Sequence, residues 1–175
     1  MSLATEMKSL ASAAKDAARA MAGLSTNVKN ELLCNMADAL VAAATVLQEA
    51  NEKDLAAGRE RGLAPAMLDR LALDDKRIAA MADGLREVAS LPDPVGEMSA
   101  QWRRPNGLQV GRMRIPLGVI GIVYESRPNV TADAAGLCLK SGNAVILRGG
   151  SEAIHSNLAI GAILKKELQR LDIPE

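Results

Sequence analysis

The sequence predicts an α/β protein in which a helical N-terminal region is followed by a β-hairpin and the beginning of a parallel sheet. Three observations support this prediction. Apolar residues recur at helical spacing through roughly the first ninety residues. An Asn-Gly pair then separates two extended segments, which is the strongest local signal for a hairpin. Finally, two short apolar runs alternate with helical patterns, as expected for parallel strands joined by helices.

Two amphipathic helices are expected at the start of the chain. The first ends near Gly23 and has an apolar stripe formed by Leu3, Met7, Leu10, Ala14, Ala17 and Met21. Ser25 or Thr26 caps the second helix. Its apolar face is formed by Val28, Leu32, Met36, Leu40, Ala43 and Leu47.

Two further helices and a clear boundary follow. Pro65 suits a first helical turn and opens a short helix that ends at about Leu71. Asp74 caps another helix, whose stripe contains Ile78, Met81, Leu85 and Val88. Residues 91–97, LPDPVGE, contain two prolines and a glycine and are therefore expected to end this helix.

A hairpin and a first buried strand are expected next. Asn106-Gly107 lies at the turn of a hairpin within residues 101–114, which also contains the single tryptophan, Trp102. The run GVIGIVYE, residues 118–125, is continuously apolar. This pattern is typical of a strand that is buried on both faces.

The last elements complete a strand–helix–strand–helix order. A helix begins near Asn129 or Thr131 and ends before Gly142. The segment NAVILR, residues 143–148, is a second buried strand, and a final helix follows over residues 152–171. Because two parallel strands and a hairpin make only a small sheet with open edges, we expect the front part of a longer protein rather than a complete small domain.

Composition excludes several functional classes. Lys and Arg total 21, as do Asp and Glu, so no charge surplus indicates a nucleic-acid partner. The alanine-rich N-terminus carries charged residues, unlike a signal peptide, and no apolar run reaches the roughly 18 residues that span a membrane. The two cysteines, Cys34 and Cys138, are too few for a disulfide framework. We expect a cytoplasmic protein without a membrane or nucleic-acid partner.

No metal site is expected from the motifs. The single histidine, His155, has no second His or Cys at ligand spacing, and a partly exposed or packing role is expected for it. Gly118 and Gly121 do not match the G-x-G-x-x-G dinucleotide fingerprint. Nevertheless, the loops after both strands lie where open α/β sheets bind ligands, and the last helix offers N-terminal amides to an anion. From the residues alone, a nucleotide or phosphate site and a plain tight turn both stay open.

Two long segments resemble a known family. They are MLDRLALDDKRIAAMADGLREVASLPDPVGE (residues 67–97) and PLGVIGIVYESRPNVTADAAGLCLKSGNAVILRGGSEAIHSN (residues 116–157). Both are similar to the gamma-glutamyl phosphate reductase family within the aldehyde dehydrogenase superfamily. The resemblance covers nearly the whole chain. It implies an aldehyde dehydrogenase-like fold with a Rossmann-like sheet that binds its dinucleotide without the usual fingerprint.

The resemblance also implies a domain organisation and an activity. Residues 1–97 would pack on the cofactor domain, residues 98–115 would form an oligomerisation arm, and residues 116–175 would be the first βαβα units of that domain. The implied reaction is the NADPH-dependent reduction of L-glutamate 5-phosphate to L-glutamate 5-semialdehyde and phosphate, in proline biosynthesis. The implied partners are further copies of the chain and glutamate 5-kinase.

No catalytic residue is expected within the chain. The superfamily uses a thiolate that attacks the acyl phosphate and leaves a thioester for hydride to reduce. Cys34 and Cys138 lie in apolar helical segments, where buried structural thiols are expected. The resemblance implies that the nucleophilic cysteine lies downstream in a second domain.

Two strand-end loops carry the implied binding residues. In the first loop, which matches a turn beside the nicotinamide, Arg127 and Asn129 are expected to bind substrate, since a guanidinium fits phosphate oxygens. The alternatives are that Arg127 pairs with Glu125 or lies on the surface and that Asn129 only caps the helix. The expected cofactor-binding residues of this first loop are Tyr124, Glu125 and Ser126.

The second loop is expected to hold the adenosine end of the cofactor. Arg148 falls on the superfamily's strand-end lysine, and Ser151 replaces the glutamate that grips the ribose in NAD-preferring members. Gly149 and Gly150 would let the backbone approach, and the loop would favour NADP. A one-residue gap would instead return an acid, Glu152, to that place.

Two alternative functions stay open. One is the equivalent reductase region of a bifunctional pyrroline-5-carboxylate synthase. The other is a non-catalytic helical interaction module, which the alanine-rich first half suggests and the sheet-like second half disfavours.

Overall fold

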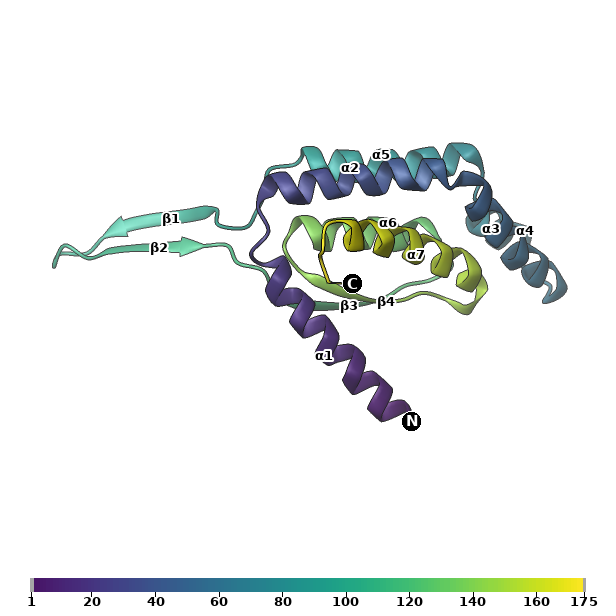
Figure 1. Cartoon of the computed structure of the whole chain (residues 1–175), viewed down its shortest axis with the longest axis horizontal. Helices are drawn as coiled ribbons and strands as arrows, with labels where there is room; N and C mark the ends of the chain where they lie inside the picture. Colours follow the sequence, from purple (N-terminus) through teal and green to yellow (C-terminus); the bar gives the residue numbers. More distant parts are fainter. Residues whose placement is uncertain (1, 175) are drawn as a thin grey trace.

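The computed structural model describes residues 2–174 and has the predicted α/β architecture. Seven α-helices, four strands and one 3₁₀ turn are found in this range (Figure 1). Their bounds are α1 Leu3–Met21, α2 Thr26–Ala42, α3 Ala44–Glu60, α4 Pro65–Leu71, α5 Asp75–Ser90, β1 Met98–Arg103, β2 Gln109–Met113, β3 Val119–Val123, α6 Asn129–Lys140, β4 Ala144–Arg148, η1 Ser151–Ala153 and α7 Ile154–Arg170.

The predicted helix starts in the N-terminal half are confirmed. Ser25 caps α2, where its side chain accepts a hydrogen bond from the Val28 amide at 3.4 Å. Asp74 caps α5 by accepting from the Arg77 amide at 2.7 Å. Pro65 stands in the first turn of α4. The Ser25 and Asp74 side chains satisfy amides that the first helical turn leaves without partners.

The long second helix of the sequence prediction is two helices. The chain bends at Ala43, with φ −96° and ψ 16°, so that α2 and α3 meet at 68°. The break lies among alanines and β-branched residues without glycine or proline, so no local signal marks it. The bend lets α2 pack on α5 while α3 packs on α7.

The elements form layers around the parallel strand pair. α2 and α5 lie together on the α6–α7 layer, α6 packs on β4, and α1 crosses the opposite side of the two strands (Figure 1). β3 and β4 are parallel, with Val119 opposite Ala144 and Val123 opposite Arg148. Both strands therefore end at the same edge of the sheet, which places their following loops side by side.

The main core lies between the helices rather than on the sheet. Its fully buried residues come from α2, α3, α5, α6 and α7 and include Leu32, Leu33, Leu40, Leu47, Ile78, Leu85 and Ile160. The few aromatic residues are thus replaced by close packing of aliphatic helices. A second, smaller cluster joins Ala17 and Ala18 of α1 to Ala144 of β4.

The prediction that β3 is buried on both faces is wrong for this chain. Val119 and Val123 are 38% and 78% exposed, and the strand alternates between exposed and partly buried positions. The cause is a sheet of only two strands, which α1 covers incompletely. For the same reason the first half of the predicted α1 stripe, Leu3, Met7 and Leu10, is exposed.

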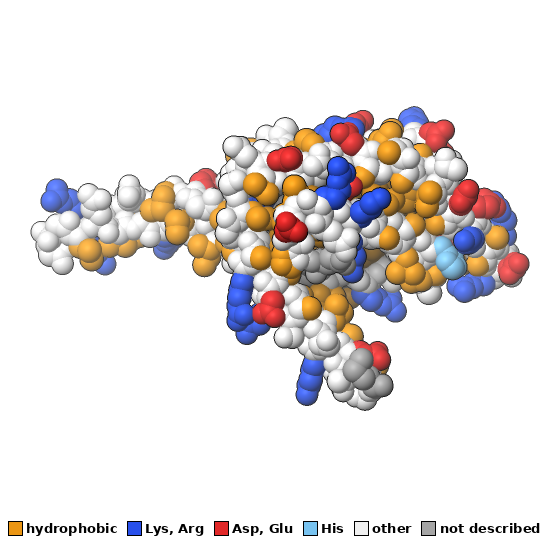
Figure 2. All heavy atoms as spheres, viewed as in Figure 1, with side chains coloured by type: hydrophobic (Ala, Val, Ile, Leu, Met, Phe, Trp, Pro, Cys, Tyr) orange, Lys and Arg blue, Asp and Glu red, His pale blue; other side chains and the backbone are white. Residues whose placement is uncertain are grey.

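The predicted hairpin projects away from the body of the protein (Figure 1). β1 and β2 pair antiparallel around a loop at residues 104–108, in which Gly107 has φ +86°. All of β1 is exposed, including Trp102, and apolar side chains lie along the arm (Figure 2). Among the described residues, no single helix is long and apolar enough to cross a membrane, whereas the bent α2–α3 pair meets the length and composition criteria.

Buried ionic groups connect the helices at the base of the hairpin. The Lys29 ammonium is 1% exposed and lies 2.5 Å from the Asp93 carboxylate, just after α5. It also donates to the Lys140 carbonyl at the end of α6. The Lys140 ammonium in turn donates to the Ala89 carbonyl of α5 and to Asn30. This network ties α2, α5 and α6 together where the chain leaves for the arm.

Candidate functional site

The two loops that sequence analysis selected lie side by side at the carboxyl ends of β3 and β4. The Tyr124 amide donates to the Arg148 carbonyl at 3.1 Å, which continues the strand pairing into the loops. The Ser126 amide lies 3.6 Å from the position that a Cβ on Gly150 would occupy. Parallel strands thus bring these loops together at the edge where open α/β sheets bind ligands.

The Gly-Gly pair has a structural explanation at its first position. A Cβ on Gly149 would overlap the Asn157 side-chain amide and lie 3.1 Å from the Tyr124 ring and hydroxyl. Gly149 therefore accommodates the protein's own side chains. Gly150 is different, because only the flexible Glu152 carboxylate would collide with a Cβ there.

A hydrogen-bonded chain links the two loops through α6 and α7. The Thr131 hydroxyl donates to Asn157 Oδ1 at 3.0 Å and lies 2.7 Å from the Tyr124 hydroxyl. Because a threonine hydroxyl has one proton, Tyr124 is the donor to Thr131. The Tyr124 hydroxyl is engaged in this internal chain, while the expected contact of Tyr124 with the cofactor stays a prediction. Sequence analysis missed Asn157 entirely and considered Thr131 only as a helix start.

The N-terminus of α7 is already occupied by a protein carboxylate. Asp54 of α3 is 2% exposed and accepts from the His155 and Ser156 amides at 3.0 and 2.8 Å and from the Ser156 hydroxyl at 2.7 Å. The His155 and Ser156 amides, which the sequence left open for an external anion, are therefore already bound within the fold. The helix begins after the η1 turn, and its positive end is neutralised from within the fold.

The remaining groups of the second loop are accessible. Arg148 ends β4 and is exposed, as is Ser151 at the start of η1. Among the described residues, the Arg148 guanidinium has no ion-pair partner. Glu152 is partly buried, and its carboxylate folds back over Gly150. This edge of the sheet thus presents a free guanidinium and a hydroxyl.

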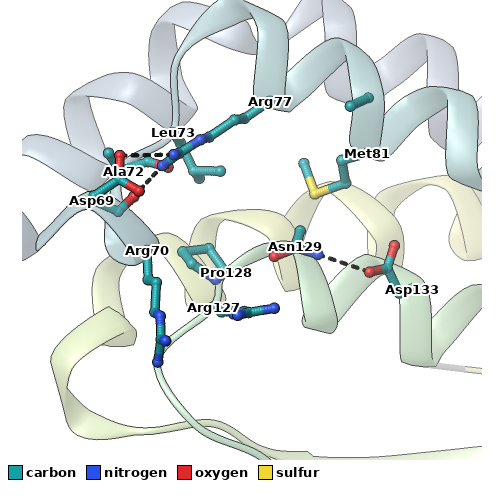
Figure 3. Close-up of a pocket in the computed structure, with 11 residues that line it drawn as sticks. Asp69, Arg70, Ala72, Leu73, Arg77, Met81, Arg127, Pro128, Asn129 and Asp133 are labelled. Atoms are coloured by element: carbon teal, nitrogen blue, oxygen red, sulfur yellow. Dashed lines mark hydrogen bonds and ion pairs between the residues drawn. The ribbon is translucent and has the colours of Figure 1, made fainter. Parts of the chain in front are cut away.

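A pocket of about 420 Å³ lies beside the first loop (Figure 3). Its walls come from α4, α5 and the beginning of α6, so the helical region and the sheet region build it together. Its lining residues are Asp69, Arg70, Ala72, Leu73, Arg77, Ala80, Met81, Arg127, Pro128, Asn129 and Asp133. The two residues expected to bind substrate, Arg127 and Asn129, therefore share one pocket.

Three arginines and two carboxylates line this pocket, and only one opposite-charge pair forms among them. Arg77 Nη2 lies 2.9 Å from Asp69 Oδ1, and Arg77 also donates to the Asp69 and Ala72 carbonyls (Figure 3). Within residues 2–174, Arg70 and Arg127 have no carboxylate partner and Asp133 has no cationic partner. The expected alternative of an Arg127–Glu125 side-chain pair is not formed. The Arg127 amide donates only to the Glu125 carbonyl, at 2.8 Å.

Asn129 points toward Asp133 and does not cap α6 through its side chain. Its Nδ2 donates to Asp133 Oδ2 at 2.9 Å (Figure 3). Burial raises the pKa of the Asp133 carboxyl, and the Asn129 hydrogen bond offsets this only in part. A carboxylate without a cationic partner thus stands on the pocket wall.

The two cysteines lie in different environments. Cys138 is buried in α6, and burial raises the pKa of its thiol, which disfavours a thiolate nucleophile. Cys34 is exposed, so its predicted burial is wrong. It lies on the outer side of α2, next to the buried Leu33 but on the opposite face from Leu32 and Met36. His155 is exposed, and the described residues contain no group of three or more potential metal ligands.

Comparison with known proteins finds reductases. No family model matches the chain. The chain is 63% identical over 175 residues to a gamma-glutamyl phosphate reductase from Geobacter metallireducens and 59% identical over 170 residues to one from Thermoanaerobacter sp.. The matches include 100% and 97% of this chain but 42% and 41% of those relatives. The chain thus spans less than half the length of the curated relatives it matches.

Solved structures agree in fold. The crystal structure of a gamma-glutamyl phosphate reductase from Thermotoga maritima matches with a TM-score of 0.91 and 43% identity, over 94% of this chain and 40% of that one. The reductase from Saccharomyces cerevisiae matches with a TM-score of 0.87 and 34% identity, over 93% and 41% of the two chains. A probable aldehyde dehydrogenase from Listeria monocytogenes shares the fold, with a TM-score of 0.73 at 16% identity.

Proposed function

Because the chain belongs to the gamma-glutamyl phosphate reductase family, we propose that it forms the cofactor-side part of an enzyme that reduces L-glutamate 5-phosphate. The products are L-glutamate 5-semialdehyde and phosphate, and a nicotinamide cofactor supplies the hydride. The observation that carries this proposal is the pocket at the end of β3, in which Arg127 stands without a carboxylate partner beside the strand-end loops. A guanidinium is well suited to bind the oxygens of an acyl phosphate.

The geometry supports a division of labour between the two loops. Arg127 and Asn129, with Arg70 nearby, line the pocket for the substrate. Glu125, Ser126, Arg148, Gly150 and Ser151 lie along the sheet edge, where the cofactor would be held. Tyr124 and Gly149 support this edge through their contacts with Thr131 and Asn157. Since Asp54 occupies the amides of α7, the cofactor's phosphates are expected to bind outside this helix terminus.

The proposal is tested most simply with a completed enzyme. The completed enzyme is a chimera in which this chain replaces the matched 42% of the G. metallireducens relative. We expect phosphate-dependent reduction of NADP⁺ when L-glutamate 5-semialdehyde is supplied, which is the reverse reaction. The 175-residue chain alone should show no turnover, since its buried Cys138 is not placed as a nucleophile. Activity of the chain alone, abolished by Cys138→Ser, would overturn that assignment.

We also propose that NADPH is preferred to NADH. Arg148 and Ser151 can bind a ribose 2′-phosphate, whereas a carboxylate at the place of Ser151 would repel it. Arg148→Ala in the completed enzyme should weaken the binding of NADPH about ten- to a hundredfold, as expected for the loss of one charge-assisted contact. It should weaken the binding of NADH much less. Glu152→Gln is the matched variant, because its carboxylate lies over Gly150 in the same loop. Equal losses for both cofactors after Arg148→Ala would contradict a 2′-phosphate contact.

The cellular setting follows from the same chemistry. An acyl phosphate must be supplied by a kinase that acts on the side-chain carboxylate, which makes glutamate 5-kinase the proposed upstream partner. The two free thiols suit a reducing cytoplasm. The projecting hairpin, with Trp102 exposed, is proposed to contact another copy of the enzyme.

A further inference from the structure

The charges around the pocket are unbalanced in a specific way. Arg77 and Asp69 satisfy each other, and the neighbouring Arg86 on α5 is paired with Asp38 and Asp83. This leaves Arg70 and Arg127 as two cations, and Asp133 as one anion, without an opposite charge among the described residues. A small molecule that complements this set has two anionic groups and one cationic group.

Asp133 is the unusual member of the set. Arg70 and Arg127 are exposed and can be hydrated, but Asp133 is partly buried, and its only hydrogen-bond partner among the described residues is the uncharged Asn129 amide at 2.9 Å. It is the fifth residue of α6, beyond the first turn, where the helix N-terminus would stabilise a negative charge most. Burying a carboxylate without a cation is costly, so the fold itself gives no reason for a charge here.

We infer that Asp133 binds the α-ammonium group of the substrate and thereby selects an amino acid derivative over its analogue without the amino group. The inference rests on the proposed function, since L-glutamate 5-phosphate carries one ammonium, one carboxylate and one phosphate. Its two anionic groups face Arg70 and Arg127, and its ammonium faces Asp133. A site that binds a polar group in this way rejects the analogue lacking it, because its own charge is then left unpaired.

Two aldehydes test this selection in the completed enzyme. L-glutamate 5-semialdehyde carries the α-ammonium, and 5-oxopentanoate is the same chain without it. We expect Asp133→Asn to lower kcat/KM about ten- to a hundredfold for the first aldehyde and to change it little for the second. Asparagine keeps an oxygen that accepts from Asn129, so the variant removes the charge alone. Asp83→Asn, on the surface of α5 outside the pocket, is the matched control and should leave both values unchanged.

Binding measured by calorimetry separates the inference from the proposed activity. The probes are L-glutamate and glutarate, which differ by the same amino group. Loss of the preference for L-glutamate in Asp133→Asn supports the inference even if the completed enzyme oxidises neither aldehyde, in which case only the proposed reaction fails. The role of Asp133 would be overturned if the wild-type enzyme bound both probes equally. It would also be overturned if Asp133→Asn lowered kcat/KM for both aldehydes by the same factor.

Discussion

At the residue scale, the packing around Gly149 explains why this position has no side chain. A side chain there would collide with Asn157 and crowd Tyr124, so Gly149→Ala should destabilise the protein by about 1–3 kcal/mol, as overpacking does. Gly161→Ala is the control, because nothing lies within 4 Å of a Cβ at that position in α7. It should be neutral or slightly stabilising, since alanine is the better helix former. Urea unfolding of both variants measures the difference, and equal stabilities would contradict the packing.

The charge state of Asp133 has a predictable effect on stability. Burial raises its pKa above 3.8, so the folded state favours the protonated form. The corresponding stabilisation is fully present below pH 3.8 and is lost as the pH rises through the raised value. Relative to Asp133→Asn, which stays neutral, the wild type should therefore lose stability between acidic and neutral pH. Unfolding of both proteins across this range checks the sign, and a constant difference would contradict it.

Some residues of the site could be predicted from the sequence, and others could not. Arg127 and Asn129 could be found because they follow a strand in a recognisable loop, and both line the pocket. Asp133 could not, since an acid within a helix is usually solvated. Asn157 and Asp54 also carried no signal, because their partners are distant in the sequence and meet only after folding.

At the element scale, the ion pair between Lys29 and Asp93 holds α2 to the segment that leaves α5. Asp93→Asn would leave the Lys29 ammonium buried without its charge partner and should cost about 3 kcal/mol, the lower end of the range for buried pairs. Chemical denaturation measures the loss. Asp16→Asn, which breaks an exposed pair with Arg19 on α1, should have little effect. A loss as small as that of the control would show that the buried pair is not stabilising.

The same pair makes a pH dependence of the opposite sign to that of Asp133. Burial favours a higher pKa for Asp93, but hydrogen bonds from Lys29, Thr26 and the Val95 amide outweigh it and lower the pKa below 3.8. Its stabilisation is therefore present above pH 3.8 and is lost as the pH falls through the lowered value. In Asp93→Asn this acid-sensitive component should be missing from the unfolding curves.

The hairpin allows a prediction about assembly. Trp102 is 39% exposed on an arm that projects from the body, and exposed aromatic residues often anchor contacts between proteins. Trp102→Ala in the completed enzyme should shift its mass toward smaller assemblies in light scattering. Leu3→Ala, an exposed apolar residue on α1, is the matched control. An unchanged mass for Trp102→Ala would mean that the arm contributes little to assembly.

Local signals account for most of the elements. The caps Ser25 and Asp74, Pro65 in the first turn and the Asn106-Gly107 pair located helix starts and the hairpin, because each acts through its immediate neighbours. The bend at Ala43 has no such signal, and it accompanies the packing of α2 mainly on α5 and of α3 on α7. The burial of β3 was overestimated, because an apolar run reports its preference for burial and not the number of strands beside it.

At the scale of the whole molecule, the helical region and the sheet region share one site. α4 and α5 contribute one wall of the pocket, and the loop after β3 with α6 contributes the other (Figure 3). Their separation in the sequence is the reason that the pocket could not be predicted from motifs alone. The resemblance to reductases could be recognised in the sequence, because continuous segments in both regions carry it.

The KM for phosphate in the reverse reaction measures whether this pocket holds the acyl phosphate substrate. In the completed enzyme, Arg127→Ala should raise the KM for phosphate about tenfold or more, while the KM for NADP⁺ stays nearly the same. Arg61→Ala removes an exposed arginine outside the pocket and should change neither value. An unchanged KM for phosphate in Arg127→Ala, with an intact fold, would mean that Arg127 does not bind the phosphate group in this pocket.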